Sequence, residues 1–242
     1  MKKLLFLGLV CTSTLFSADI KLYTEDFPPY QTNENGKLSG ISIDIINEIK
    51  KRVKDDISIE SNDWDTSYNK ALNNKNCGVF STGRTKDRES LFKWIGPIGK
   101  TKYIFFTNAQ NDYYIGNPED AQAKAKHILV SKNDVSHQIL TNLGMKNLKV
   151  SDDKSSKENI QTVAKDKEVL WASDYYSGIY KIRKLGLESK IKPMMSNRPF
   201  IATTMNIAFN INTDEKVIEN WNQALKQIVD DGTYAKIMQK YE

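Results

Sequence analysis

The sequence predicts an α/β fold, and two observations support that prediction. Short apolar runs with strand character alternate with segments whose apolar residues recur at helical spacing. This alternation occurs twice, in one series before and one series after a polar turn at residues 108–112. A strand separated from the next strand by a helix usually pairs with it in parallel. We therefore expect parallel strands covered by helices.

The first series covers residues 20–107. Pro28 and Pro29 end its first strand, and the turn-forming residues 33–36 follow. Residues 42–53 are predicted to form an amphipathic helix, because isoleucines and a valine recur there at helical spacing between charged residues. The other predicted elements are strands at 20–24, 57–60, 78–81 and 103–107 and a helix at 68–74.

The second series starts at residue 127. Asp134 is predicted to cap a helix that continues to Leu143, and Ser155 with Glu158 forms a capping box for the next helix. Asp174 precedes a further helix. The other predicted elements are strands at 127–130, 169–172 and 205–210 and helices that end near Gly186 and Gly232.

The N-terminus has the layout of a secretory signal peptide over residues 1–18. Lys2 and Lys3 precede an apolar run that is shorter than the ~20 residues of a membrane span, and small residues end it at Ala18. The large Val10 before Cys11 argues against lipidation. We expect cleavage near Ala18 and export of a soluble protein to a Gram-negative periplasm, with no membrane insertion after cleavage.

The composition restricts the class of partner. The chain has 242 residues, of which 39% are hydrophobic and 27% charged, and its formal net charge is +5 at pH 7. A nucleic-acid-binding protein usually has a more clustered basic excess. Two His and two Cys are too few for most structural zinc sites, and Cys77 lies in an apolar run typical of a buried strand. We expect a monomer without cofactor, metal, disulfide or nucleic acid.

Four short blocks of sequence occur in a characteristic order and spacing. They contain the sequences FPPY and GISID (27–30, 40–44), DWD (63–65), STGRTKDRE and FKWIGP (81–89, 92–97), and NIAF and DGTY (206–209, 231–234). In these blocks, and over nearly its full mature length, the chain resembles the polar amino-acid-binding family of periplasmic substrate-binding proteins of ABC transporters, solute-binding protein family 3.

The resemblance implies a two-lobed periplasmic-binding-protein (type II) fold, in which two α/β domains are joined by two hinge strands. Lobe 1 would comprise residues 19–106 and 204–242, and lobe 2 residues 107–203. The hinge strands would be 103–107 and 203–209. It also implies that a free amino acid binds in the cleft between the lobes and is delivered to a membrane permease of an ABC transporter.

The resemblance assigns the two charged ends of the ligand to Arg88 and Asp174. A free amino acid is a zwitterion, so its carboxylate needs a forked cation and its ammonium needs a carboxylate. Arg88 matches the family's carboxylate-binding Arg, although a solvated residue in a charged run is the plainer interpretation, and Arg84 is a rival. Asp174 matches the ammonium-binding Asp, although from the sequence alone a plain helix N-cap is the better interpretation, and one carboxylate can fill both roles.

The remaining candidates come from the same resemblance. Aromatic residues that match the family's cleft walls are Phe27, Tyr30 and Trp64, for which core packing is the alternative. Positions that match backbone donors to the ligand carboxylate are Ser81, Gly83, Val135 and the adjacent Ser136. Lys132 and His137 could reach the mouth of the cleft, but as lone polar residues on a loop and a helix they are expected simply to be exposed.

Two departures from the family pattern concern selectivity. Gly83 stands where family members often carry Thr, which removes one hydroxyl from the carboxylate site. Thr24 stands where receptors for cationic or amide side chains often carry Asp, and the alternation of strand neighbours would turn the adjacent Glu25 away. We therefore expect a side-chain pocket that does not primarily select a cationic amino acid.

Two other functions remain open. Some relatives on this fold are dehydratases or lyases of small acids, which need a cleft acid or base, and Glu25 is the single spare carboxylate that the sequence offers for that role. A sensory module for a chemoreceptor ordinarily continues into a transmembrane segment, whereas this chain ends at Glu242. A soluble component that docks on a separate sensor would have the same sequence features. We expect a receptor without catalytic residues.

Overall fold

The computed structural model describes residues 18–53, 55–152, 156–194 and 198–241. Apart from Ala18, the predicted signal peptide with Cys11 lies outside these residues, and so does Ser155 of the predicted capping box. Within the described part of the chain, no helix is both long and apolar enough to cross a membrane.

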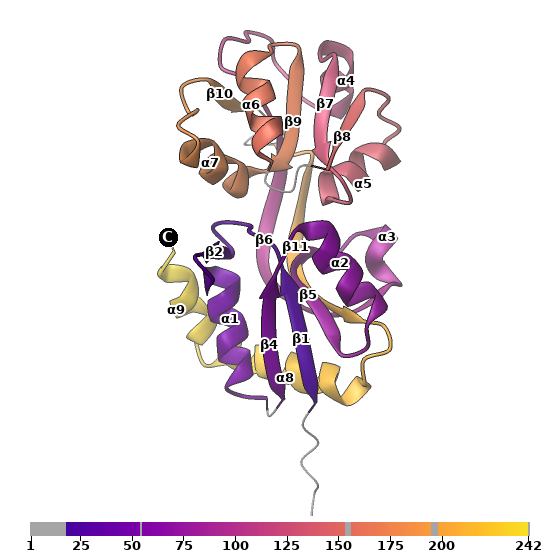
Figure 1. The fold of residues 1–242 in the computed structure, drawn as a ribbon, viewed down its shortest axis with the longest axis vertical. Helices are drawn as coiled ribbons and strands as arrows, with labels where there is room; N and C mark the ends of the chain where they lie inside the picture. The colour runs from indigo at the N-terminus through magenta and orange to yellow at the C-terminus, as the bar shows by residue number, and fades with distance from the viewer. Residues whose placement is uncertain (1–17, 54, 153–155, 195–197, 242) are drawn as a thin grey trace, which may run out of the picture.

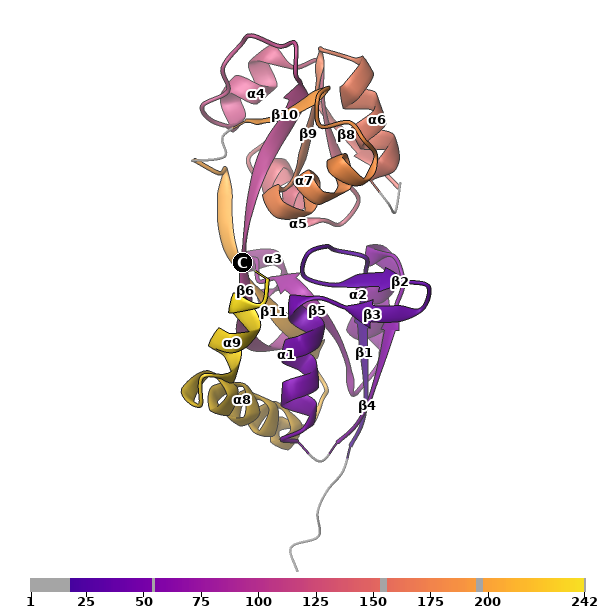
Figure 2. The same cartoon turned by 90° about the vertical axis from the view of Figure 1, so that its left-hand side faces the viewer.

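The molecule consists of two lobes joined by two long strands (Figures 1 and 2). The two strands that run through both lobes are β6 (Phe92–Asn108) and β11 (Ile201–Asn210). The other elements of lobe 1 are β1 (Asp19–Thr24), β2 (Thr32–Glu34), β3 (Lys37–Ser39), α1 (Ile41–Lys50), β4 (Asp56–Ser61), α2 (Trp64–Asn73), β5 (Cys77–Gly83), α3 (Lys86–Glu89), α8 (Glu215–Asp230) and α9 (Thr233–Gln239). Those of lobe 2 are α4 (Pro118–Lys124), β7 (His127–Ser131), α5 (Val135–Asn142), β8 (Leu148–Ser151), α6 (Lys157–Lys165), β9 (Val169–Asp174), α7 (Tyr175–Lys184) and β10 (Ile191–Met194).

The strands of each lobe pair as the alternation of elements predicts. In lobe 1, β1 is parallel to β4 and β5, and in lobe 2, β7 is parallel to β8 and β9. The antiparallel strands β6 and β11 connect these two groups, and the sheet order is β4-β1-β5-β11-β6-β9-β7-β8, with β10 paired to β6. The predicted α/β fold and its two-lobed arrangement are confirmed.

The connection between the lobes is a change of partner along β6. Tyr103 is the cross-strand partner of Ile201 on β11 and also of Asp174 on β9. Residues before Tyr103 therefore pair within lobe 1 and residues after it pair within lobe 2. The predicted lobe boundaries at 106/107 and 203/204 lie close to this point and stay a prediction.

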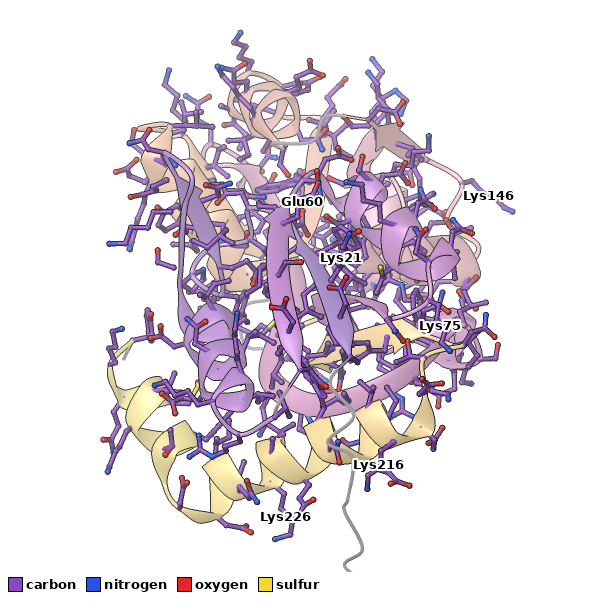
Figure 3. All side chains as sticks on the ribbon, turned by 60° about the horizontal axis from the view of Figure 1, so that its bottom comes forward. Lys21, Glu60, Lys75, Lys146, Lys216 and Lys226 are labelled. Atoms are coloured by element: carbon purple, nitrogen blue, oxygen red, sulfur yellow. The ribbon has the colours of Figure 1, made fainter. Side chains whose placement is uncertain are left out.

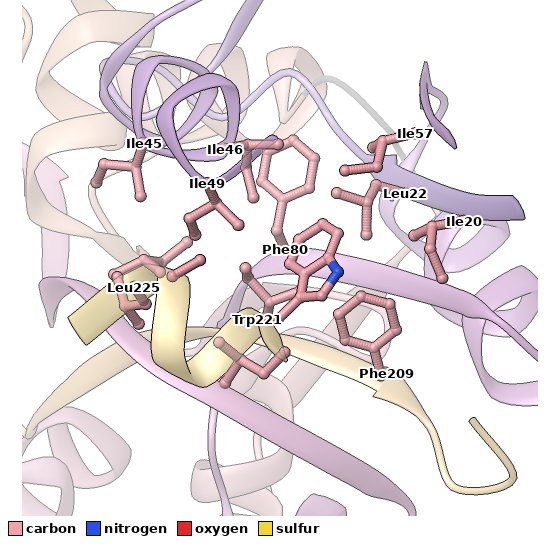
Figure 4. Close-up of a cluster of buried hydrophobic side chains, with 14 of the residues drawn as sticks. Ile20, Leu22, Ile45, Ile46, Ile49, Ile57, Phe80, Phe209, Trp221 and Leu225 are labelled. Carbon is pink, nitrogen blue, oxygen red and sulfur yellow. The ribbon is translucent and has the colours of Figure 1, made fainter. Parts of the chain in front are cut away.

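The core of lobe 1 is built from both ends of the chain (Figure 4). Ile20 and Leu22 on β1 pack in one cluster with Phe209 on β11 and Trp221 on α8. The Phe209 and Trp221 rings meet edge to face, with centroids 5.0 Å apart, and the Trp221 indole N–H donates to Asp55 Oδ2 at 2.9 Å. Burial of these large side chains supplies the main free energy that holds the C-terminal helices against the N-terminal strands.

The sheet of lobe 2 is covered by helices on both faces. Phe105 packs with α4 and α5 on one face, whereas its neighbours Ile104 and Phe106 pack with α6 and α7 on the other. The alternation follows from the two-residue period of a strand, and continuous apolar runs are expected for strands buried on both faces.

Several elements differ from the predictions. Strand β6 has 17 residues although only 103–107 were predicted, and α4, α9 and β10 were not predicted. Helix α2 begins at Trp64 rather than at Tyr68, because the Asp63 carboxylate caps it by accepting from the Thr66 N–H at 3.0 Å. The prediction of a packed core cysteine is confirmed, since Cys77 is free and buried.

Charged side chains are distributed over both lobes (Figure 3). Among the labelled lysines, Lys21 lies on β1, Lys146 lies in lobe 2, and Lys216 and Lys226 lie on α8. Several surface lysines are paired, as in Lys226 with Asp230 and Lys70 with Glu60. Exposed pairs of this kind contribute little to stability, so the charges mainly keep the surface hydrated.

Candidate functional site

A cavity of about 150 Å³ lies between the two lobes. Lobe 1 contributes the segment after β1 and the start of α2, and lobe 2 contributes the ends of β7 and β9 and the start of α7. The carboxylates on its wall are Glu25, Asp63 and Asp65 from lobe 1 and Asp134, Asp152 and Asp174 from lobe 2. The amines on its wall are those of Lys132 and Lys181, both from lobe 2.

Asp174 lies on the cavity wall and also caps a helix. Its Oδ1 accepts from the Ser177 N–H at 2.8 Å, while Oδ2 accepts from the Thr101 hydroxyl and from the Lys102 N–H at 3.3 Å. Burial raises the pKa of this carboxyl group to about 6, against the lowering effect of these hydrogen bonds. A carboxylate has about four acceptor positions, so one remains for a cationic group in the cavity.

Glu25 lies on the cavity wall, whereas Thr24 is fully buried behind it. The expectation that Glu25 turns away is wrong, because β1 ends at Thr24 and the alternation of strand neighbours ends with it. Burial raises the pKa of Glu25 to about 7, and the nearby Lys181 amine opposes this shift. With a carboxyl group on the cavity wall at Glu25, the threonine at position 24 does not disfavour a cationic ligand.

Arg88 lies on α3 and is fully buried, and it is not among the described residues of the cavity wall. Its guanidinium stacks over the rings of Trp64 and Tyr68, with centroids 5.0 and 5.3 Å away. Nη1 donates to the Gly83 carbonyl at 3.2 Å and Nη2 to the Asn133 carbonyl at 2.7 Å. Nε has no hydrogen-bond partner among the described residues. Arg88 is thus a buried, incompletely satisfied cation, and the interpretation as a solvated residue is wrong.

Arg84, the rival of Arg88, has a different environment. Its guanidinium lies at the surface, donates twice to Glu89 at 2.7 and 2.5 Å, and covers the Trp94 ring. Arg84 is therefore paired with Glu89 at the surface, and it is not among the described residues of the cavity wall.

Asn133 of lobe 2 closes the cleft against lobe 1. Its carbonyl accepts from the Trp64 indole N–H at 3.0 Å and from Arg88, and its side-chain amide donates to Asp65 at 2.5 Å. Its backbone is left-handed, with φ of 57°. Its N–H donates to His137 Nδ1 at 3.2 Å. Asn133 thus contacts three residues of lobe 1 and accepts a hydrogen bond from Arg88. The lobes are also joined by hydrogen bonds from Thr85 to Gln138 and from Asn142 to Asp87.

The proposed backbone donors lie behind the described cavity wall. A Cβ on Gly83 would come within 2.7 Å of Val135 Cγ2, so the glycine permits close approach of the lobes. The Ser136 N–H donates to the Asp134 carboxylate at 2.8 Å, so in this conformation the chain itself supplies the anion at the start of α5. The Ser81 hydroxyl lies 2.6 Å from Gln31 Oε1, inside lobe 1.

The aromatic candidates divide into two groups. Phe27 and Trp64 lie on the cavity wall. Tyr30 is buried in the core of lobe 1, and its hydroxyl donates to the Lys100 carbonyl at 3.2 Å. For Tyr30 the core-packing alternative describes its position. Lys132 is exposed, as expected, at the edge of the cavity, where it lies 3.2 Å from Asp152.

Several wall residues were not predicted. Asp63 and Asp134 had a recognisable signal, because each is an N-cap, and the helices that they cap begin at the cavity. Lys181 and Asp65 are helix residues whose sequence context resembles any exposed helical turn. Among the described residues, no group of His, Cys, Asp and Glu has a metal-binding arrangement.

Comparisons with known proteins agree with this architecture. The chain is 22% identical over 214 residues to the L-cystine-binding protein TcyA of Bacillus subtilis (strain 168), covering 88% of this chain and 75% of that protein. It is 24% identical over 243 residues to an arginine-binding periplasmic protein of Mannheimia haemolytica, covering 99% and 98%.

A histidine kinase sensor domain with similarity to periplasmic binding proteins superposes with a TM-score of 0.81 at 17% identity, covering 93% of this chain and 96% of that chain. This likeness is one of fold. The family model of bacterial extracellular solute-binding proteins, family 3, matches residues 20–242. The chain belongs to that family.

Proposed function

We propose that this protein is an extracytoplasmic receptor that binds a free amino acid between its lobes and delivers it to the permease of an ABC transporter. The observation that carries the proposal is that lobe 1 holds a buried, incompletely satisfied Arg88 that donates across to Asn133, while lobe 2 holds a buried Asp174 on the cavity wall. The ligand carboxylate would replace the Asn133 carbonyl on Arg88, and the ligand ammonium would take the remaining acceptor position of Asp174.

The relatives support an amino acid as the class of ligand. One is named for cystine and another for arginine, and both of these molecules carry an α-amino-acid head group. Their side chains differ, so the shared feature is the head group that Arg88 and Asp174 would bind. Release of the Asn133 contact requires the lobes to separate, so binding would proceed through opening and closure about β6 and β11.

The test is a double-mutant cycle between the protein and the ligand. A thermal-shift screen of the common amino acids identifies the best ligand, since a ligand at one hundred times its Kd stabilises by about 2.7 kcal/mol. Calorimetry then compares wild type and Asp174→Ala with that ligand and with its analogue lacking the α-amino group. The analogue should bind wild type weakly and lose little further affinity in Asp174→Ala. Full additivity of the two losses would overturn the assignment of Asp174.

Delivery to a permease is tested in cells. Cells that lack this chain should lose uptake of the labelled ligand, and wild type but not Asp174→Ala should restore it. Circular dichroism of Asp174→Ala is the control, because loss of the α7 cap costs ~1 kcal/mol. Restored growth or signalling without any uptake would instead favour a sensory partner.

An enzymatic alternative rests on Glu25, whose carboxyl group on the cavity wall has a pKa raised to about 7. A group that titrates near neutrality can act as a general acid or base. NMR of the best ligand incubated with the protein distinguishes the two functions. A receptor leaves the ligand unchanged, whereas turnover that Glu25→Gln abolishes would establish catalysis.

A further inference from the structure

Ala18, the first residue that the structure describes, is packed into lobe 1. Its side chain belongs to the buried core cluster that also contains Ile20 and Leu22. These three positions alternate with the exposed residues Asp19 and Lys21, as the two-residue period of a strand requires. The inward-facing row of β1 therefore starts at Ala18, and this residue is part of the folded lobe.

The backbone of Ala18 is tied to the start of β4. Its carbonyl accepts from the Asp56 N–H at 2.9 Å, and its N–H donates to Asp55 Oδ1 at 3.1 Å. The other carboxylate oxygen of Asp55, Oδ2, accepts from the indole N–H of the fully buried Trp221 at 2.9 Å. An asparagine has one side-chain oxygen, so only a carboxylate serves both donors with separate oxygens. Asp55 thus joins the start of β1 to helix α8.

The bond at which the predicted signal peptide is cut decides the charge of this nitrogen. A cut between Ser17 and Ala18 converts it from a neutral amide into an α-ammonium group, whereas a cut after Ala18 removes it and leaves Asp55 Oδ1 without this donor. The residue directly before a cut has to be small, and Ser17 is small. The third residue before the cut would be Leu15, which is smaller than the Phe16 that a cut after Ala18 would place there.

We propose that the signal peptide is cut between Ser17 and Ala18, and that the α-ammonium group of Ala18 then forms an ion pair with Asp55 that stabilises lobe 1. A charged donor makes a hydrogen bond to a carboxylate roughly twice as strong as a neutral donor does. The carboxylate is already oriented for this donor, because Trp221 holds its second oxygen. No ligand takes part in the ion pair, so its tests are independent of the proposed function.

The position of the cut is tested on the exported protein. The full chain is expressed in a Gram-negative host, and the intact mass and the N-terminal sequence of the exported product are measured. We expect a product that starts at Ala18 with a free amino group. A product that starts at Asp19, or at any residue before Ala18, would overturn the proposal.

The ion pair is tested by a double-mutant cycle. One chain starts at Ala18, and the other carries Gly-Ser-Gly before Ala18, which keeps the amide N–H and moves the ammonium group up to about 10 Å along the chain. Hydrogen exchange of the β1 amides measures the unfolding equilibrium constant of lobe 1 in each chain. Asp55→Asn should raise this constant about three- to tenfold more in the chain that starts at Ala18 than in the extended chain.

Asp56→Asn is the matched control, because this exposed neighbour undergoes the same change of charge. Its effect should be equal in the two chains within about twofold. An equal effect of Asp55→Asn in both chains would overturn the ion pair, and so would an equal dependence on the chain start for both variants, since the ammonium group would then respond only to nearby negative charge. If Asp55→Asn does not fold, the unsubstituted chains decide. The extension alone should raise the unfolding constant about three- to tenfold, and an unchanged constant would overturn the ion pair.

Discussion

Lobe 1 and lobe 2 present their cleft groups in different ways. Arg88 of lobe 1 packs against two aromatic rings and donates to the Gly83 carbonyl of its own lobe, and its remaining hydrogen bond is to the Asn133 carbonyl of lobe 2. Asp174 of lobe 2 is tied to the connecting strand itself, through the Thr101 hydroxyl and the Lys102 N–H. If the lobes rotate about β6 and β11, Arg88 therefore moves with lobe 1, whereas Asp174 stays next to β6.

The largest loss of affinity is expected when Arg88, the cationic group of lobe 1, is removed. Arg88→Ala should weaken the best ligand by roughly thirty-fold to several thousand-fold, because loss of one member of a buried charge pair costs about 2–5 kcal/mol. Arg88→Lys should also bind poorly, since an ammonium group cannot reproduce the forked contact. Calorimetry measures both variants.

Arg84→Ala is the matched control for Arg88, four residues away and paired with Glu89 at the surface. It should retain affinity within about twofold, because exposed ion pairs contribute about 0–1 kcal/mol. A folded Arg88→Ala that keeps wild-type affinity would contradict the assignment of the carboxylate site.

The next effect tests how closely the lobes must approach. Gly83→Ala places a Cβ against Val135, and an overpacked contact costs about 1–3 kcal/mol, so affinity should fall by about five- to one-hundred-fold. Val135→Ala in the same chain should recover most of the loss, because it removes the colliding methyl group. Small-angle scattering with saturating ligand should show a larger radius of gyration for Gly83→Ala alone. An unrelieved loss in the double variant would mean that closure does not depend on this contact.

Lowering the pH should weaken the contribution of Asp174, the anionic group of lobe 2, to ligand binding. The pKa of Asp174 is raised to about 6 from an ordinary value of 3.8, and its ionised form is the one that binds an ammonium group. Affinity should therefore fall about tenfold for each pH unit below 6. In the same protein without ligand, the free energy of unfolding should fall as pH rises from about 4 to 6. In that window the folded state holds a proton that the unfolded state has lost.

Asp174→Asn should remove both pH dependences, leaving only the contribution of Glu25, whose pKa of about 7 lies higher. Calorimetry at several pH values and chemical denaturation at the same values provide the two measurements. A pH profile that is identical in wild type and Asp174→Asn would assign the titration to another group.

The smallest effect concerns the closing contact at Asn133. Asn133→Gly preserves its left-handed backbone and removes only the side-chain contact with Asp65, so affinity should change by no more than about threefold. Small-angle scattering of the ligand-free protein should show a larger radius of gyration, because the lobes separate more readily. An unchanged radius would mean that the other contacts between the lobes, among them the Asn133 carbonyl with Arg88 and Trp64 and the Asn142 amide with Asp87, suffice to hold the cleft closed.

The alternating elements and the four sequence blocks were sufficient to predict the fold. Local patterns could not reveal that β6 runs through both lobes, because Gly96 and Pro97 interrupt its strand character while cross-strand pairing with β11 maintains it. The same limit applies to Arg84 and Arg88. They lie in one charged run, and burial separates them only when Trp64 and Tyr68 arrive from another helix.

At the site, the sequence indicated Asp174, Trp64, Phe27 and Glu25, and all four lie on the cavity wall. The sequence could not predict that the Asn133 carbonyl of lobe 2 would accept a hydrogen bond from Arg88, because that contact joins the two lobes. The sequence also did not indicate Lys181, whose position depends on which face of α7 turns toward the cavity.

The assembly of the lobe 1 core has a consequence for the order in which the chain acquires structure. Lobe 2 is one continuous stretch, so its sheet and helices can form as soon as that stretch is available. Lobe 1 cannot, because Phe209 and Trp221 complete a core whose other side was laid down with Ile20 and Leu22 (Figure 4). Contacts between such distant segments form slowly, since a long loop must close first. During synthesis, the half of the cleft that holds Arg88 is therefore the last part to become competent to bind, and it does so only when α8 has been made.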